Sequence, residues 1–155
     1  MKMTLYNHCL IFYHLHKDTT LTVYDLLIKH EGLRLKVYKC SEGFNTIGFG
    51  RNLDTNGISE EEAFMMLEQD IFKCRKQLDC LSFAKKLNEA RYAVLIDMIF
   101  NLGFAGFTKF KLMIAALESG DYNEAATQML DSRWAKQVGV RANELAEIMT
   151  RGTFE

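Results

Sequence analysis

The spacing of apolar residues places a short segment with strand periodicity between segments with helical periodicity. Residues 22–31 predict a helix, which opens with Thr22 and Asp25 at the spacing of a capping box. The period then changes, since residues 35–39 and 44–50 are rich in β-branched and aromatic residues and flank a turn that contains glycine. This part of the chain therefore predicts one helix followed by a β-hairpin.

From residue 59 onward the pattern is helical throughout. Ser59 and Glu62 form a second capping box, and an acidic first turn complements a helix N-terminus, so no function is assigned to residues 60–62. Residues 93–100 are apolar on nearly every side and predict a buried central helix that Gly103 and Gly106 break. Three further amphipathic helices are expected at residues 110–118, 122–131 and 140–149, separated by residues 119–121 and 132–139.

These elements predict an α+β fold that is mostly α, with a small helix and hairpin lobe and a helical lobe joined by a long helix. The expected boundaries are 21–58 for the hairpin lobe, 59–80 for the bridging helix and 81–155 for the helical lobe. Residues 1–20 form an N-terminal extension of unknown role, expected to be dispensable for chemistry. A cleft between two lobes is the default position for a ligand.

Composition agrees with a globular domain and excludes some classes of function. Hydrophobic residues make up 48% of the 155 residues, and proline is absent, which favours helices with short connections. The formal net charge is -1. Proteins that bind nucleic acid usually carry an excess of basic residues, so the charge does not predict nucleic acid as a partner. The apolar stretch at residues 10–13 is too short for a membrane span and lacks the features of a signal peptide.

The four cysteines show no pattern typical of a disulfide framework or a metal site. No pair has C-x-x-C spacing, and no set of Cys and His repeats at the spacing of zinc ligands. We therefore expect free thiols, no metal and no cofactor. A cysteine enzyme that uses Cys40 with His30 is an open alternative, although the histidines fall in no recognisable Cys-His arrangement.

Glu31 is the first candidate for chemistry, because it ends the predicted helix of residues 22–31. The partial negative charge at a helix C-terminus disfavours ionisation of a carboxyl group, and burial would add to that effect. A protonated carboxyl is the proton donor that glycoside hydrolysis requires. From position alone, an ordinary solvated surface carboxylate is the favoured interpretation of Glu31, because most glutamates are solvated.

Three motifs in order resemble one known family. The first motif resembles the active-site segment of T-even phage lysozymes, glycoside hydrolase family 24. In that family a Glu is followed after eight residues by Asp or occasionally Cys, and after five more by Thr. Here the pattern falls on Glu31, Cys40 and Thr46. The similarity continues in residues 90–103 and 132–137 and ends in residues 151–154. It covers roughly residues 22–154, nearly everything except the extension.

The resemblance implies a lysozyme-like fold and a muramidase that hydrolyses the β-1,4 bonds between N-acetylmuramic acid and N-acetylglucosamine in bacterial peptidoglycan. It implies a soluble monomer without a cofactor, made in the host cytoplasm and acting in the periplasm or cell wall if it is a phage endolysin. Glu31 is then the general acid, Thr46 holds the attacking water, and Arg141 supports the glutamate. Asn52, Phe100, Asn101 and Gln128 contact saccharide or shape its site, with a core position for Phe100 as an equal alternative, and Trp134 is structural.

Two positions depart from the family pattern. Arg51 replaces a histidine, and a permanently charged guanidinium cannot titrate. Cys40 replaces the aspartate, and its thiolate could act as base or nucleophile, with Lys39 or Arg51 as a nearby cation that favours ionisation. Cys40 also leaves open a lytic transglycosylase with one carboxyl group, a catalytically weak peptidoglycan binder, or an engineered replacement of a native aspartate.

Overall fold

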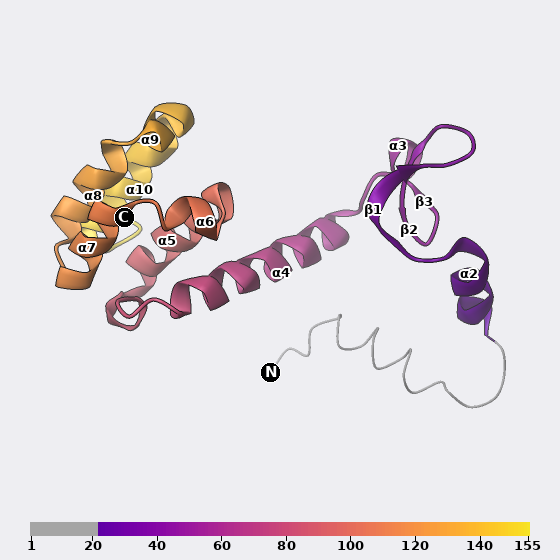
Figure 1. The fold of residues 1–155 in the computed structure, drawn as a ribbon, viewed down its shortest axis with the longest axis horizontal. Coiled ribbons are helices and arrows are strands. Elements are labelled where there is room, and N and C mark those ends of the chain that lie inside the picture. The colour runs from indigo at the N-terminus through magenta and orange to yellow at the C-terminus, as the bar shows by residue number, and fades with distance from the viewer. Residues whose placement is uncertain (1–21) are drawn as a thin grey trace. The chain divides into compact units, whose positions relative to one another are not determined.

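The computed structural model describes residues 22–155, so the predicted extension 1–20 lies outside the described residues. The chain divides into two compact units, Met1–Met66 and Leu67–Glu155. Each unit is described by itself below. Figure 1 labels the elements along the chain.

Unit 1 begins with a helix whose first turn is capped as the sequence predicts. The backbone N–H of Asp25 donates to the Thr22 hydroxyl over 3.3 Å, and the Thr22 N–H donates to the Asp25 carboxylate over 2.9 Å. The reciprocal bonds satisfy two donors that a helix N-terminus otherwise leaves unpaired. The elements of this unit are α2 (Val23–Glu31), β1 (Arg34–Lys39), β2 (Asn45–Gly48), β3 (Arg51–Asn52) and α3 (Leu53–Asn56).

The predicted hairpin is confirmed as β1 and β2, and a third strand extends it into an antiparallel sheet of order β1-β2-β3. Thr46 lies in the middle strand, opposite Tyr38 on β1 and Asn52 on β3. The third strand escaped the sequence analysis because two residues are too few to show an alternating pattern.

The long helix α4 (Glu60–Asp79) starts at the predicted capping box. The Ser59 N–H donates to the Glu62 carboxylate over 2.7 Å, and the Glu62 N–H donates to the Ser59 hydroxyl over 3.2 Å. The boundary between the two units falls inside α4, after Met66. The helix therefore contributes residues to both units.

Unit 2 is helical. The central helix α5 (Glu89–Leu102) buries Val94, Leu95, Met98 and Ile99 and ends at Gly103, as expected. Gly106 does not break a helix, because it lies inside α6. The remaining elements are η1 (Ala84–Lys86), α6 (Phe104–Phe107), α7 (Lys111–Ser119), α8 (Tyr122–Leu130), α9 (Arg133–Val138) and α10 (Val140–Arg151).

Residues 132–139 were expected to separate two helices, and instead they contain α9. Ser132 caps this helix, since its hydroxyl accepts the Ala135 N–H over 3.0 Å. Six residues are too short for an amphipathic period to be read, although the serine is the usual capping signal.

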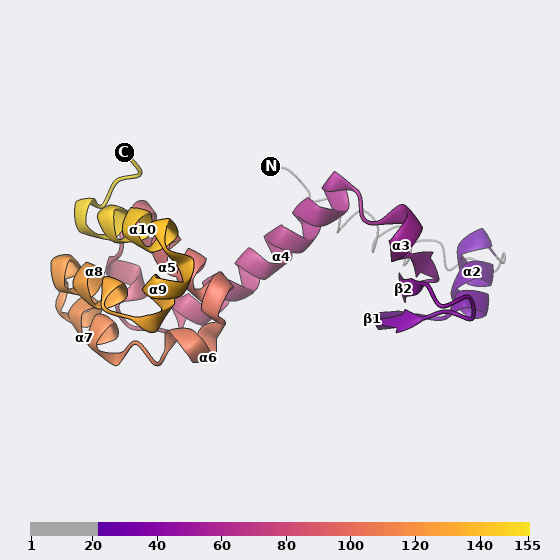
Figure 2. The ribbon, with the colours of Figure 1, turned by 90° about the horizontal axis from the view of Figure 1, so that it is seen from above.

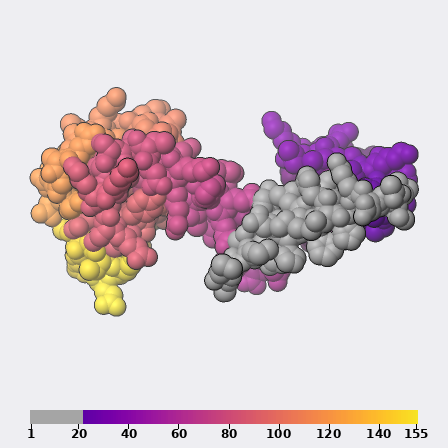
Figure 3. All heavy atoms as spheres, turned by 90° about the horizontal axis from the view of Figure 1, so that it is seen from below, coloured from indigo at the N-terminus to yellow at the C-terminus, as the bar shows by residue number. Residues whose placement is uncertain are grey.

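The packing of unit 2 follows from its apolar faces. Helix α8 contacts both α7 and α10, and α10 also contacts α5 (Figures 1 and 2). The last residues of the chain, yellow in Figure 3, lie at the surface of this unit, where Phe154 is 63% exposed. Helices dominate the described residues and one small sheet accompanies them, which confirms the α+β, mostly α prediction.

Candidate active site

Glu31 and Gly50 are in direct contact in unit 1. Glu31 is the last residue of α2, and Gly50 follows strand β2 with φ of +80°. A Cβ atom placed on Gly50 would lie only 2.6 Å from the Glu31 carboxylate oxygen Oε2. The carboxyl group therefore rests against a stretch of backbone that has room for it only because residue 50 is glycine. The Glu31 side chain is exposed, so burial does not contribute to keeping its carboxyl group protonated in unit 1.

Cys40 opens the turn between β1 and β2, and the turn surrounds its sulfur with donors. The Gly43 N–H donates to the Cys40 carbonyl over 2.9 Å, and the Cys40 N–H donates to the Phe44 carbonyl over 3.0 Å. These bonds fold the chain so that the N–H groups of Glu42 and Phe44 reach the Cys40 sulfur. Such a concave set of backbone N–H groups binds anions.

The electrostatics of this turn favour the Cys40 thiolate. Burial raises the pKa of the thiol, but hydrogen bonds from the Glu42 and Phe44 N–H groups and from the Thr46 hydroxyl outweigh it and hold the pKa below its ordinary value. The expected cation is not the cause, because neither Lys39 nor Arg51 is among the groups that lower the pKa. Hydrogen bonds to the charged form do the work that was assigned to a neighbouring cation.

Thr46 connects this turn to the sheet. It is the single polar residue among the described ones that is fully buried, with 3% of its surface exposed. Its hydroxyl donates to the Phe44 carbonyl over 3.2 Å and also lies within hydrogen-bonding reach of the Cys40 sulfur. A hydroxyl has one proton, so it serves the carbonyl when Cys40 is a neutral thiol and the sulfur when Cys40 is a thiolate.

Arg51 takes part in a bridge that the sequence analysis missed. Its Nε–H donates to the Gly57 carbonyl over 2.8 Å, and its Nη1 lies 2.6 Å from the Glu62 carboxylate. Glu62, to which no function was assigned, thus holds Arg51 with one oxygen and caps α4 with the other. The pair ties the strand next to Gly50 to the first turn of α4.

Asn52 lies on β3 beside Thr46, in the position that the sheet register gives it. Its side-chain oxygen caps α3 by accepting the N–H groups of Asp54 and Thr55 over 2.9 and 3.1 Å. Only its NH₂ group remains available to a ligand. Unit 1 therefore holds Glu31 at the end of α2, against Gly50, and separately links Cys40 in the turn to Thr46 and Asn52 on neighbouring strands.

The other predicted site residues belong to unit 2. Phe100 is 47% exposed, so its alternative interpretation as a core aromatic is wrong. Asn101, next to it on α5, accepts the indole N–H of Trp134 over 2.8 Å. Trp134 is 4% exposed, which confirms its structural role and shows that it fixes the orientation of the Asn101 amide.

Arg141 forms a two-point ion pair with Asp97 on α5. Its Nε and Nη2 donate to the two carboxylate oxygens over 3.0 and 2.9 Å, and these bonds raise the pKa of the guanidinium. The two bonds hold the guanidinium group in one orientation, and its third nitrogen, Nη1, remains available as a donor. The role predicted for Arg141, support of the catalytic glutamate, stays a prediction.

Gln128 lines an open groove of about 660 Å³ in unit 2, together with Trp134 and Phe110. Its amide NH₂ donates to the Glu124 carboxylate over 2.7 Å, which leaves the amide oxygen free to accept a bond. Within residues 22–155 no group of His, Cys, Asp and Glu side chains is arranged to hold a metal ion. In the same range no helix is long and apolar enough to cross a membrane.

Known proteins resemble this chain over most of its length. Residues 28–152 match the phage lysozyme family. The chain is 29% identical to the Pre-baseplate central spike protein Gp5 of Enterobacteria phage T4, over 89% of this chain and 29% of that protein. It is 32% identical to an endolysin of Acyrthosiphon pisum secondary endosymbiont phage 1, over 72% of this chain and 75% of that protein. Probable T4-type lysozyme 1 of Dictyostelium discoideum is 26% identical, over 86% of this chain and 96% of its own length.

A match over this much of the chain, together with the fold, defines the class as a lysozyme-type glycoside hydrolase that degrades peptidoglycan. The chain belongs to the phage lysozyme family. It spans less than a third of the length of the spike protein and most of the length of the endolysin and the amoebal lysozyme.

Proposed function

We propose that this enzyme hydrolyses the β-1,4 bonds between N-acetylmuramic acid and N-acetylglucosamine, with Glu31 as the general acid. The observation that supports the proposal is the turn that favours the thiolate of Cys40, in the same unit as Glu31, whose carboxyl group rests against Gly50. Glycoside hydrolysis uses one group that donates a proton and a second group that stabilises the developing positive charge or accepts a proton.

In the proposed reaction, Glu31 donates its proton to the glycosidic oxygen while the bond from that oxygen to the anomeric carbon breaks. Positive charge develops on the sugar ring, and the Cys40 thiolate stabilises it. Thr46 orients a water molecule that adds to the anomeric carbon, and the thiolate takes its proton. The enzyme is then reset when the Cys40 proton exchanges with solvent and the Glu31 carboxylate is protonated again.

We assign supporting roles to the residues that the family resemblance implies. In this proposal Arg141 orients the Glu31 carboxyl group, and its two-point pair with Asp97 leaves Nη1 available as a donor. Asn52, Phe100, Asn101 and Gln128 contact the saccharide, since each keeps an amide group or a ring face available.

Lysis of exposed cell walls tests the proposed function. Purified protein should clear a suspension of chloroform-treated Gram-negative cells between about pH 5 and 8, because the proposed mechanism combines a proton donor with an anionic group. Turbidity is the measurement, with heat-denatured protein as the control. A suspension that keeps its turbidity while the protein sediments with the walls would identify a catalytically weak binder instead.

A lytic transglycosylase is the second candidate, favoured by the lack of a carboxylate at Cys40. That enzyme needs one acid/base group and closes an anhydro ring by internal attack, so it forms no new reducing end. Mass spectrometry of digested peptidoglycan separates the two, because hydrolysis adds a water to each cleaved bond. We expect fragments that contain the added water.

The contact between Glu31 and Gly50 gives a sharp test with a matched control. In Gly50→Ala the new methyl group must displace the Glu31 carboxylate, because 2.6 Å is too short for a contact between a methyl carbon and an oxygen. Gly48→Ala introduces alanine at a comparable φ of +68° with nothing within 4 Å. Both variants should lose about 1–2 kcal/mol of stability, since left-handed backbone is unfavourable for alanine.

Only Gly50→Ala should lose activity beyond that shared loss of stability. A misplaced acid of this kind lowers the rate by about 10²-fold. Thermal unfolding measures the strain that both variants share, and turbidity loss below the unfolding temperature measures catalysis. Equal activity in the two variants would show that the Glu31 carboxylate does not need its place on Gly50.

A further inference from the structure

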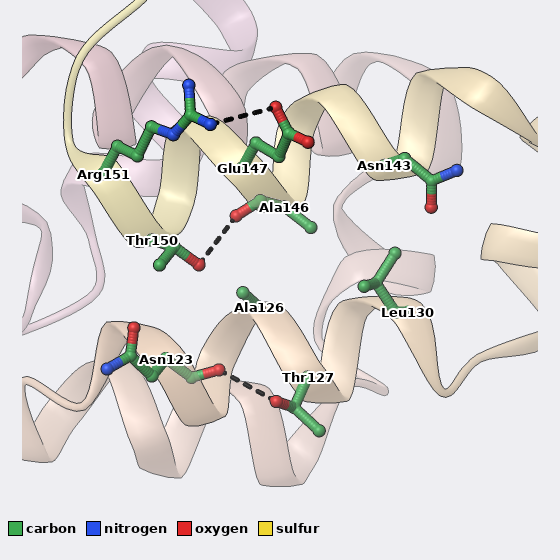
Figure 4. Close-up of a pocket in the computed structure, with 9 residues that line it drawn as sticks. All are labelled: Asn123, Ala126, Thr127, Leu130, Asn143, Ala146, Glu147, Thr150 and Arg151. Carbon is green, nitrogen blue, oxygen red and sulfur yellow. Dashed lines mark hydrogen bonds and ion pairs between the residues drawn. The ribbon is translucent and has the colours of Figure 1, made fainter.

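A second groove lies in unit 2, between α8 and α10, and none of the proposed catalytic or saccharide-contacting residues lines it. Its volume is about 580 Å³, within the range of ligand sites. Figure 4 shows the two helices as its walls. Its lining residues are Asn123, Ala126, Thr127, Leu130, Asn143, Ala146, Glu147, Thr150 and Arg151.

The groove carries amide groups that have no partner within residues 22–155. Asn123 on α8 and Asn143 on α10 lie toward opposite ends of it (Figure 4), and neither side-chain amide takes part in a hydrogen bond with a described residue. The Thr127 and Thr150 hydroxyls donate to the carbonyls of Asn123 and Ala146, both over 3.0 Å. Each hydroxyl oxygen therefore keeps a lone pair for a ligand.

The floor between these walls is apolar and shallow. Ala126 and Ala146 meet there and are 5% and 4% exposed, so their methyl groups close the groove without filling it. The charged members, Glu147 and Arg151, lie 3.9 Å apart and cancel each other. A neutral groove with a small apolar floor and amides at both ends fits a neutral, hydrogen-bonding, ring-shaped ligand.

We propose that this groove binds a segment of a glycan strand made of N-acetylated amino sugars, apart from the catalytic residues. The inference rests on the proposed function, which makes such a strand the substrate. An acetamido group needs one donor and one acceptor, and an asparagine side chain supplies both. Asn143 and Thr150 are about 10 Å apart along α10 at 1.5 Å per residue, which leaves room for a disaccharide.

Such a site would hold the enzyme on the cell wall, which the net charge of the chain does not do. Peptidoglycan is acidic and the formal net charge of the protein is -1, so long-range attraction does not hold the enzyme on the wall. Short-range hydrogen bonds outside the catalytic residues are then the available means of retention. The groove supplies them with no net charge, because its one carboxylate, on Glu147, is paired with Arg151.

Nuclear magnetic resonance on the full chain tests the inference, with Glu31→Gln as the background so that sugar is not cleaved. Titration with a trimer of N-acetylglucosamine should shift the side-chain amide signals of Asn123 and Asn143. The deacetylated trimer should leave both unmoved, because it lacks the acetamido group. If the acetylated trimer leaves them unmoved at saturation, or if only the stem peptide of peptidoglycan moves them, the proposal is wrong.

A second measurement uses retention on purified cell walls in the same background. Asn123→Ala combined with Asn143→Ala should weaken retention about tenfold, the loss expected for one modest hydrogen bond at each end. Glu144→Ala is the control, an exposed residue beside Asn143 that does not line the groove. Equal retention of the double variant and the control would overturn the inference, whereas failure of the parent protein to degrade walls would overturn the proposed function instead.

Discussion

Glu31→Gln should lower the rate of wall lysis by about 10²–10⁴-fold, the range typical of losing a general acid. The amide keeps the shape and the hydrogen-bonding reach of the carboxyl group but has no proton of suitable acidity to give. Glu31 is exposed, and among residues 22–155 its side chain has no hydrogen-bond partner that a glutamine would lose. The variant should therefore unfold at the same temperature as the parent, which separates catalysis from folding.

The control for this variant is Glu60→Gln, which removes the same charge from an exposed position in the first turn of α4. It should lyse walls at close to the parent rate. Turbidity gives the rate, and circular dichroism on heating gives the stability. If Glu31→Gln keeps most of the activity, Glu31 has no part in the mechanism and the family resemblance of residues 31–46 misassigns the acid.

The fold was predictable where a local signal and the packing agree. The two capping boxes, Thr22 with Asp25 and Ser59 with Glu62, were identified from spacing alone, and both form in the structure. A side chain three residues along a helix reaches its start whatever the rest of the chain does, so this signal does not depend on tertiary contacts. The elements that escaped prediction, β3 and α9, are shorter than one reliable period of their pattern.

The candidate site was predictable only as a set of residues. The family resemblance identified Glu31, Cys40 and Thr46 as candidates, but it does not show that backbone N–H groups of the turn stabilise the sulfur. Those donors depend on backbone dihedral angles, including φ of +86° at Gly43. The predicted stabilising cation, Lys39 or Arg51, is therefore replaced by hydrogen bonds from the turn itself.

The Arg51–Glu62 pair shows a different limit. The sequence predicts only a capping role for Glu62, which uses one carboxylate oxygen. The other oxygen binds Arg51 at 2.6 Å. A carboxylate has lone pairs for several donors, so one satisfied role does not exclude another. The position of Arg51 directly after Gly50 was the available signal, since it departs from the family's histidine.

Cys40 is the residue whose replacement should tell most about the second half of the reaction. Cys40→Ala and Cys40→Ser should both lose most of the lytic activity, because neither side chain ionises near neutral pH. Cys40→Asp should keep or raise it, since a carboxylate is also an anion and the Glu42 and Phe44 N–H groups can donate to it. Cys80→Ala is the matched control, an exposed free thiol in a different part of the chain.

The pH dependence separates a thiolate from a carboxylate. The hydrogen bonds in the turn lower the pKa of Cys40, so its reactive form is present above that value and is lost as the pH falls through it. An aspartate at the same position ionises near its much lower pKa of about 4. The acid-side rise of activity should therefore move to lower pH in Cys40→Asp.

Thiol alkylation provides an independent route to the same conclusion. In a variant with Cys9, Cys74 and Cys80 replaced, iodoacetamide can modify Cys40 alone, and lysis should fall as far as in Cys40→Ala. The lowered pKa should make this reaction faster than for an ordinary cysteine at the same pH, because the thiolate is the nucleophile. If Cys40→Ala lyses walls as fast as the parent, the thiol is a spectator, and a mechanism with the Glu31 carboxyl as its one acid/base group replaces the one proposed here.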